Sequence, residues 1–224
     1  MSNMQNKKDR NLKVTAAGLI RSAGLFAILA GVLYISIQFV HPPEQISSVN
    51  SGTWIIAACL TLAMSLFSLF GIIGIYTKQV TEAGWLGLAG FLIFSLFWLA
   101  STAFSFIEAF VLPLLTTEAP QFVEGFLGIF GGADSEVYLG ILPALAPIAG
   151  ILYLLGGLLL GIATFRAAVL PQLPAGLLAF GAVVTLAGAI IPHPIDRILA
   201  IPMGLAFIWL GYILWSERKS SIGK

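Results

Sequence analysis

The stretch Trp85–Leu115, WLGLAGFLIFSLFWLASTAFSFIEAFVLPLL, holds a single charged residue, Glu108. An α-helix rises about 1.5 Å per residue, so roughly 20 apolar residues cross the hydrocarbon core of a bilayer. This stretch is longer than that and predicts a membrane-spanning helix. A carboxylate on such a helix costs several kcal/mol unless it faces protein, water or a partner. Glu108 is therefore a candidate functional residue.

The rest of the chain has the same apolar character. Of its 224 residues, 58% are hydrophobic and 9% are charged, whereas about a quarter are charged in a soluble domain. We expect an all-α, polytopic membrane protein, a bundle of six transmembrane helices joined by short polar connections. The predicted spans are Ala16–Val40, Thr53–Tyr76, Trp85–Leu112, Val137–Phe165, Ala175–Ile191 and Ile198–Trp215.

These spans define one transmembrane domain, residues 16–216, between a basic tail at 1–15 and a short tail at 217–224. The first span is too long for a signal-peptide core and has no A-x-A cleavage site, so we expect it to be retained. In the segment 119–132, Phe122, Phe126 and Phe130 recur every four residues. That spacing predicts an amphipathic helix, lying on the outer leaflet or as a lid over the bundle.

The distribution of positive charge predicts the orientation. Six spans put both termini on one side, and Lys and Arg are enriched on cytoplasmic segments. All but one of the 11 basic residues fall on the side of the termini, the exception being Arg197. We therefore predict that both termini are cytoplasmic and that the protein is a multi-pass protein of a bacterial cytoplasmic membrane. The basic tails suit anionic lipid, and no pattern indicates nucleic-acid binding.

Polar residues recur at helical spacing near the outer ends of two spans, and a third group follows the fifth span. Residues at i, i+4 and i+7 share one helix face, so each set would face inward together. The candidate ligand or pathway residues are Tyr34, Gln38, His41, Ser101, Ser105, Glu108, His193, Asp196 and Arg197. A further stripe of Thr61, Ser65 and Ser68 lies nearer the middle of the second span. If the helices are neighbours, these residues surround a polar vestibule that opens outward.

Three kinds of function fit this pattern. The favoured one is a small-solute transporter or a ligand-binding membrane protein that uses the vestibule, with Pro143 and Pro147 kinking the fourth span. An alternative is a metal-dependent membrane hydrolase, with zinc held by His41, His193 and Glu108. The chain has no H-E-x-x-H motif and no Ser-Lys or Ser-His nucleophile pattern, so an enzyme is the less favoured class, and no other cofactor is expected. The third alternative is a non-catalytic membrane subunit or regulator.

Each candidate also has a purely structural interpretation. His41 and His193 both precede proline, as residues at a helix stop do. Glu108 is near enough to the end of its span to reach the headgroups or to pair with Arg197, and Ser or Thr hydroxyls in membrane helices often bond to their own backbone.

Small residues predict where helices approach closely. Ala23, Ala27 and Gly31 share one face of the first span, and Gly157 and Gly161 share a face of the fourth. This spacing drives helix association in lipid, either within the chain or in a homo-oligomer or with a membrane partner. The single cysteine, Cys59, excludes an intrachain disulfide and a Cys-based zinc cluster.

Three segments resemble a group of small bacterial six-span membrane proteins to which no activity is assigned. They are HPPE (41–44), FGIIGIYTKQVTEAGWLGLAGF (70–91) and IEAFVLPLL (107–115). The resemblance implies a bacterial membrane setting and six spans, and it implies no catalytic residue.

Overall fold

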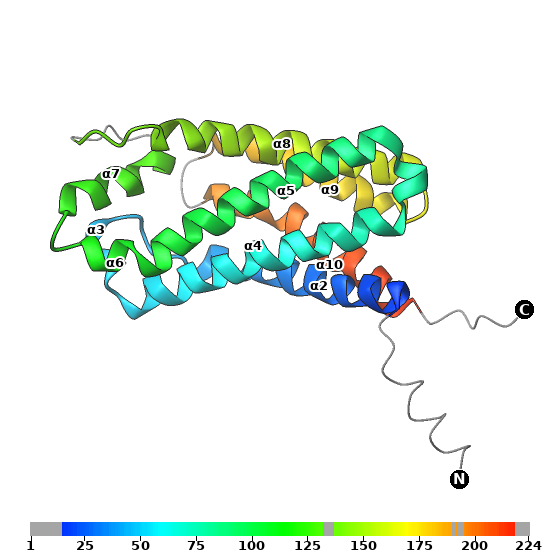
Figure 1. Ribbon diagram of the computed structural model, residues 1–224, viewed down its shortest axis with the longest axis horizontal. Coiled ribbons are helices and arrows are strands. Elements are labelled where there is room, and N and C mark those ends of the chain that lie inside the picture. Colours follow the sequence, from blue (N-terminus) through cyan, green and yellow to red (C-terminus); the bar gives the residue numbers. More distant parts are fainter. Residues whose placement is uncertain (1–14, 132–136, 190, 192–194, 218–224) are drawn as a thin grey trace, which may run out of the picture.

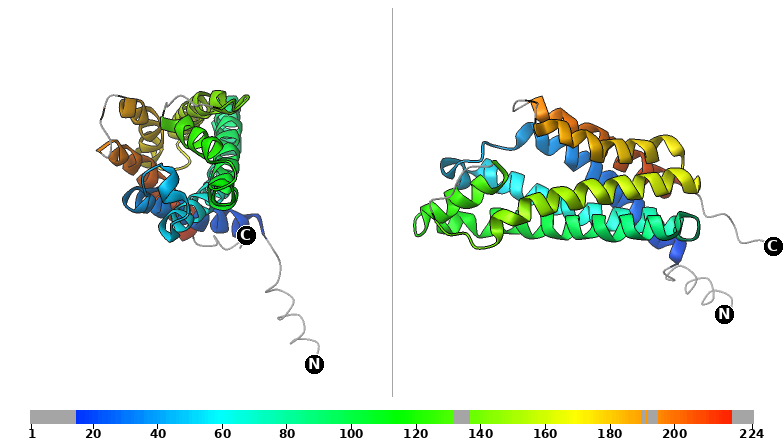
Figure 2. Two further views of the ribbon diagram at one scale, coloured as in Figure 1. Left: turned by 90° about the vertical axis from the view of Figure 1, so that its left-hand side faces the viewer. Right: turned by 90° about the horizontal axis from the view of Figure 1, so that it is seen from above.

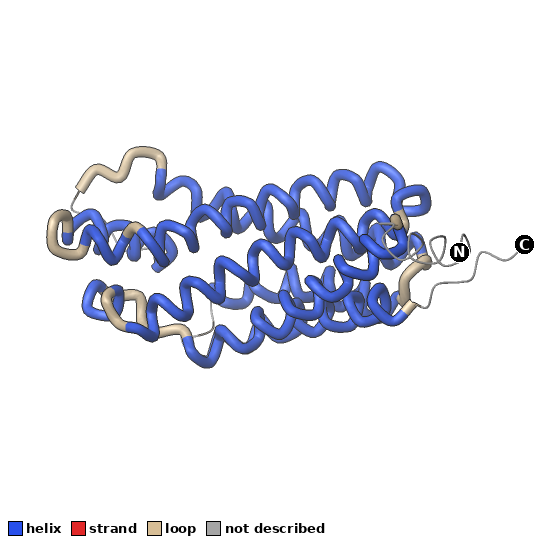
Figure 3. Tube along the Cα trace, turned by 60° about the horizontal axis from the view of Figure 1, so that its bottom comes forward, coloured by secondary structure: helices blue, strands red, loops and turns tan. Residues whose placement is uncertain are grey.

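The computed structural model describes residues 15–131, 137–189, 191 and 195–217, which form helices joined by short connections (Figure 1). No strand occurs in these residues, so the predicted all-α class is confirmed for them (Figure 3). The elements are α2 (Ala16–Val40), α3 (Ile46–Val49), α4 (Gly52–Lys78), α5 (Val80–Phe110), α6 (Leu112–Leu115), α7 (Pro120–Gly131), α8 (Leu142–Ala167), α9 (Gln172–Val184), the 3-10 helices η2 (Thr185–Ala189) and η3 (Ile195–Ala200), and α10 (Ile201–Ser216).

Five helices in the described part of the chain are long and apolar enough to cross a membrane: α2, α4, α5, α8, and α10 with the end of η3. The first predicted span coincides with α2 at both ends. The fifth predicted span, Ala175–Ile191, is instead a 13-residue α-helix, α9, that continues as the five-residue 3-10 helix η2. The chain therefore consists of long apolar helices, as expected of a multi-pass membrane protein.

The start of the fourth span differs from the prediction. We expected a helix from Val137 that is kinked by two prolines, but α8 begins at Leu142 and Pro143 lies in its first turn. A proline is well tolerated there because its missing N–H has no acceptor within the helix. Pro147 is the proline that lies inside α8, so only this residue removes a hydrogen bond from the helix interior.

The helices form a ring that consists, in chain order, of α2, α4, α5, α8, α9 and α10, and α2 closes it by packing against α10 (Figure 2). Glycine brings the backbones close at these contacts. A Cβ built on Gly24 would lie 2.7 Å from the Gly211 carbonyl oxygen, and one on Gly31 would meet the Gly204 carbonyl. Because residue numbers rise along α2 as they fall along α10, these two helices are antiparallel.

The small residues singled out in the sequence are all used in packing within the chain. Ala23 and Ala27 of α2 face Gly74 and Gly71 of α4, respectively. On α8, Gly157 faces Ala182 and Gly161 faces Ala179, both of α9. These faces provide close helix approach inside the bundle, and an oligomer through them stays a prediction.

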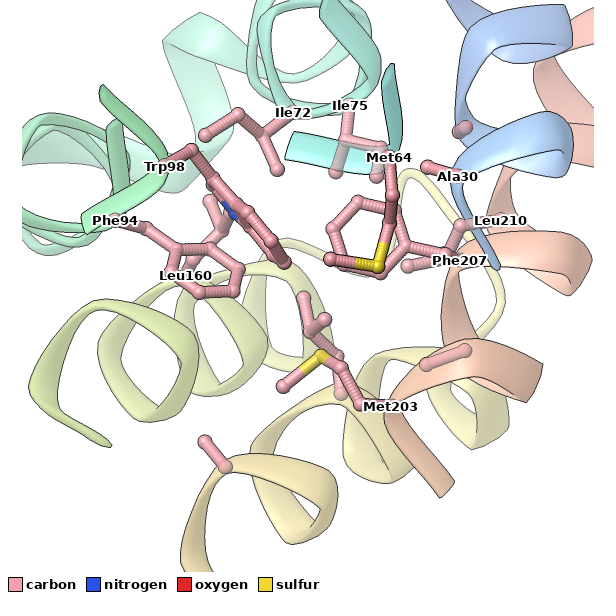
Figure 4. Close-up of a cluster of buried hydrophobic side chains, with 14 of the residues drawn as sticks. Ala30, Met64, Ile72, Ile75, Phe94, Trp98, Leu160, Met203, Phe207 and Leu210 are labelled. Carbon is pink, nitrogen blue, oxygen red and sulfur yellow. The ribbon is translucent and has the colours of Figure 1, made fainter. Parts of the chain in front are cut away.

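Aromatic and aliphatic side chains fill the centre of the ring (Figure 4). Phe94 and Trp98 of α5 are fully buried, and both rings pack against Phe207 of α10 with centroid distances of 6.3 and 5.9 Å. Met64 of α4 and Met203 of α10 complete the same cluster. This core closes the middle of the bundle.

A second apolar cluster lies at the end of the bundle that carries α3, α6 and α7 (Figure 1). The predicted amphipathic segment 119–132 forms α7, and its Val123, Phe126 and Leu127 are buried. Phe126 packs on Phe104 of α5 with ring centroids 5.7 Å apart, and Leu112 of α6 belongs to the same cluster. The apolar face of α7 thus packs on the chain itself; the side chain of Phe130 lies outside the described residues.

The opposite end of the bundle carries both ends of the described chain (Figure 1). There Lys78, the last residue of α4, forms an ion pair of 2.6 Å with Glu217, which follows α10. Nearby, the buried Gln79 donates from Nε2 to Thr164 Oγ1 at 2.6 Å. These contacts tie α4, α8 and α10 together at this end.

Candidate functional site

A cavity of about 720 Å³ lies between α2, α4 and α5 in the half of the bundle nearest α7. Its deep part lies beside the central core, and its mouth lies beside the segment that follows α2. The lining residues are Tyr34, Ile37, Gln38, His41, Pro42, Pro43, Glu44, Thr61, Met64, Phe97, Trp98, Ser101, Phe104, Ser105, Glu108, Ala149 and Arg197. Most of the candidates named from the sequence therefore line one cavity.

The α2 side of the cavity holds Tyr34, Gln38 and His41 on one helix face. The helix ends at Val40, and His41 caps it through a main-chain N–H that donates to Ile37 O. Pro42 prevents another helical turn, so the predicted helix stop at His41 is confirmed. The ring Nδ1 of His41 lies 2.9 Å from Pro42 O, which holds the imidazole at the mouth.

The α5 side holds Ser101, Ser105 and Glu108, again on one face. Ser101 Oγ lies 2.7 Å from Ser65 Oγ of α4, so this hydroxyl also joins two helices. The main-chain carbonyl of Glu108 accepts a hydrogen bond of 3.1 Å from Trp54 Nε1. Within the described part of the chain, the Glu108 carboxylate itself has no hydrogen-bond or ion-pair partner.

Arg197 reaches the mouth from η3, near the other end of the sequence. Its Nη1 donates to the main-chain carbonyls of Gln38 at 2.9 Å and His41 at 3.1 Å. Gln38 lies in the last turn of α2 and His41 is its C-cap residue, so neither carbonyl has a donor within the helix. The predicted alternative of a Glu108–Arg197 ion pair is not formed in this structure, because the guanidinium caps α2 instead.

The two other candidates of this region are not assigned to the cavity. His193 lies outside the described residues. Asp196 lies in η3, but its side chain is not among those described.

A pair of tyrosines lies at the deep end of the cavity. Tyr34 Oη donates to Tyr153 Oη of α8 at 3.1 Å, and Tyr153 Oη lies 3.5 Å from Gly181 O of α9. This chain of hydroxyls crosses the ring from α2 to α9. Trp98 lies beside it, with its ring 6.1 Å from that of Tyr34. Together with the core, these side chains form a floor.

Several lining residues were not among the candidates named from the sequence. Thr61 belongs to the predicted third stripe, and its Oγ1 donates to Ala57 O at 2.9 Å, the backbone bond expected of a threonine in a membrane helix. Phe97, Trp98 and Phe104 are aromatic residues that hydropathy alone cannot separate from core residues. Trp98 lies three residues before Ser101 and seven before Ser105, and this helical spacing is the signal that places it on the cavity face.

Only two of the three proposed zinc ligands lie within the described residues. His41 and Glu108 line the same cavity, but His193 lies outside the described residues. Among the described residues, no group of three His, Cys, Asp or Glu side chains is arranged to hold a metal ion. A zinc site stays a prediction.

The helical, apolar ring with its internal cavity defines the class of this chain as a multi-pass membrane protein. Beyond the class, comparisons with protein-family models, curated proteins and solved structures return no match. The resemblance to small bacterial six-span proteins stays a prediction from the residues.

Proposed function

We propose that this protein crosses the membrane six times, with both termini in the cytoplasm, and binds a small ligand in a cavity open to the outer face. The sixth crossing is supplied by α9 and η2. Their 13 α-helical and 5 3-10 residues extend about 30 Å, the thickness of a hydrocarbon core. The antiparallel packing of α9 against α8 supports this assignment.

Charge supports the orientation. Arg21 near the start of α2, Lys78 at the end of α4 and Arg166 in the last turn of α8 lie at the end of the bundle that carries the termini. Arg197 lies at the other end. Enrichment of positive charge on the cytoplasmic side therefore favours a cavity that opens outward, and a bacterial cytoplasmic membrane is the setting we propose.

One observation carries the binding function: the polar faces of α2 and α5 both line the same cavity. Polar side chains on membrane helices are costly, and they persist where they face protein or a water-filled space. A cavity of about 720 Å³ lies within the size range of small-molecule sites, roughly 300–1,000 Å³. A mostly apolar lining with a few polar groups is also typical of such sites.

The floor favours ligand binding over transport. Tyr34 and Tyr153 are hydrogen-bonded across the ring, and the core with Phe94 and Phe207 lies beside them. Transport requires an opening through this layer, whereas binding requires none. We therefore place binding first and transport second.

Cysteine labelling tests the proposal. In a Cys59→Ala background, Ser105→Cys introduces a thiol into the cavity and Phe106→Cys introduces one at the adjacent position, whose native side chain is 52% exposed and does not line the cavity. A membrane-impermeant cationic methanethiosulfonate added to intact cells should label position 105, because it lines the cavity and the proposed orientation opens that cavity to the outside. Position 106 should stay unlabelled, because lipid surrounds it. Labelling of position 105 only in inverted vesicles, or in neither orientation, would overturn the proposal.

A further inference from the structure

We propose that the cavity takes an amphipathic ligand that carries an ammonium group, with the Glu108 carboxylate as its counter-ion. The inference rests on the proposed function and adds the chemical class of the ligand. The unpartnered Glu108 carboxylate and the aromatic lining below it carry the inference.

The charges at the mouth favour a cation. Glu108 and Glu44 both line this part of the cavity, and the exposed Glu44 is held near by the short segment after α2. Arg197 and His41 are the basic residues among the described lining residues, and the Arg197 guanidinium already donates to the main-chain carbonyls of Gln38 and His41. α5 also ends here, so the negative end of its dipole points toward the mouth. A bound ammonium would give the Glu108 carboxylate the partner that the described residues lack.

The aromatic lining suits the rest of such a ligand. Tyr34, Phe97, Trp98 and Phe104 are the aromatic residues of the lining, and aromatic rings attract both cations and apolar groups. Trp98 lies ten residues before Glu108 on the same helix, so the aromatic floor is about 15 Å from the mouth. The cavity is thus acidic at its mouth and aromatic at its floor. A ligand with its charged group at Glu108 and an apolar body directed inward matches this arrangement.

The floor also contains an unsatisfied donor. Trp98 has no exposed surface, and its indole Nε1 has no hydrogen-bond partner among the described residues. A buried N–H without an acceptor costs about 1–3 kcal/mol. Trp98 lines the cavity, so a ligand or water there would be next to this side chain. The nitrogen itself is buried away from the cavity surface, so the inference rests on Glu108 and the cavity lining, and this donor adds no ligand contact.

Three probes with one apolar body and different head charges test the ligand class. Phenylbutylamine is a cation at neutral pH, phenylbutanol is neutral and phenylbutyrate is an anion. Binding of each to the full chain in phosphatidylglycerol nanodiscs is measured by calorimetry, with empty discs subtracted. We expect the amine to bind about tenfold more tightly than the alcohol, because a charge-assisted hydrogen bond is gained, and the acid to bind most weakly.

Two carboxylate variants supply matched controls. Glu108→Gln should bring the amine and the alcohol to equal affinity, whereas Glu108→Asp should retain a preference for the amine. Glu118→Gln changes an exposed carboxylate outside the cavity lining and should leave the preference at about tenfold. Thermal unfolding of each variant shows that the fold is retained.

Equal affinities in the unmodified protein, an amine preference that survives Glu108→Gln, or no binding of any probe would overturn the ligand class. The proposed function would still stand in these cases if position 105 is labelled from outside, so the two failures are distinguishable. Replacing half of the lipid with phosphatidylethanolamine separates two sources of ammonium. A Glu108-dependent loss of amine affinity would identify a lipid headgroup as the source, and an unchanged affinity would identify a free amine.

Discussion

The Arg197 side chain connects two segments that lie far apart in the sequence. It follows α9 by more than ten positions, yet its guanidinium Nη1 donates to the carbonyls of Gln38 and His41. Helix C-terminal carbonyls lack intrahelical donors, and a cation near them is further favoured by the helix dipole. Arg197 thus stabilises the end of α2 and one wall of the cavity mouth together.

Replacing this residue should lower stability. Arg197→Gln removes a charged donor to two partly buried carbonyls, and we expect a loss of about 1.5–3 kcal/mol, measured as thermal or denaturant unfolding in detergent. The matched control is Arg166→Gln, because Arg166 is exposed and has no hydrogen bond or ion pair to the described residues. An equal loss in both variants would show that Arg197 acts only through net charge.

At the residue scale, the sequence predicts which side chains share a face but not what they bond to. Helical spacing placed Tyr34, Gln38 and His41 on one face, and they do line one cavity. The bond from Tyr34 to Tyr153 depends on how α2 and α8 face each other across the ring. No local pattern contains that information, and the same is true of the contact between Arg197 and α2.

At the scale of elements, hydropathy determines the long helices well because lipid requires continuous apolar stretches with internal hydrogen bonds. The bounds of α2 follow the apolar run at both ends. The predicted helix bounds are wrong where the sequence stays apolar but the backbone is no longer α-helical. Val137–Ile141 is apolar apart from Gly140 yet precedes α8, and the run after Val184 is 3-10 and not α-helical. Hydropathy does not distinguish these conformations.

The contact of α2 with α10 is too close to accept a larger side chain at its glycines. Gly31 lies against Gly204 so closely that a Cβ on it would meet the Gly204 carbonyl and Ile208. We expect Gly31→Ala to lower stability by about 1–3 kcal/mol, because overpacking a close contact forces the helices apart. Gly150→Ala is the control: that glycine lies in α8, and a Cβ on it would have no atom within 4 Å.

Thermal unfolding in detergent measures both variants. Gly150→Ala should be neutral or slightly stabilising, because alanine favours helix more than glycine does. A neutral Gly31→Ala would contradict this expectation. It would show that α2 and α10 can separate slightly without loss of stability, so that their close contact is not required for the fold.

At the scale of the whole molecule, the two ends of the ring differ: an ion pair joins helices at one end, and the helix α7 packs over the other. Lys78 and Glu217 join α4 to the end of α10 at the side of the termini. At the other side, α7 covers the bundle and Asn50 donates to Thr116 Oγ1 at 2.8 Å between neighbouring connections. The two alternatives for the segment 119–132 were a helix on the lipid surface and a lid. The buried face of α7 favours the lid, because it packs on α5 and α6.

If α7 is a lid, weakening its contacts should open the cavity. Phe126 is 1% exposed and packs on Phe104, which lines the cavity. We expect Phe126→Ala to cost about 3 kcal/mol in local stability and to raise the rate at which Ser105→Cys is labelled from outside. Leu114→Ala is the control, because Leu114 of α6 is 75% exposed at the same end. It should leave the labelling rate unchanged. A rate unaffected by Phe126→Ala, in a variant that still folds, would mean that the ligand reaches the cavity beside His41 and Glu44 and that α7 does not gate its entry.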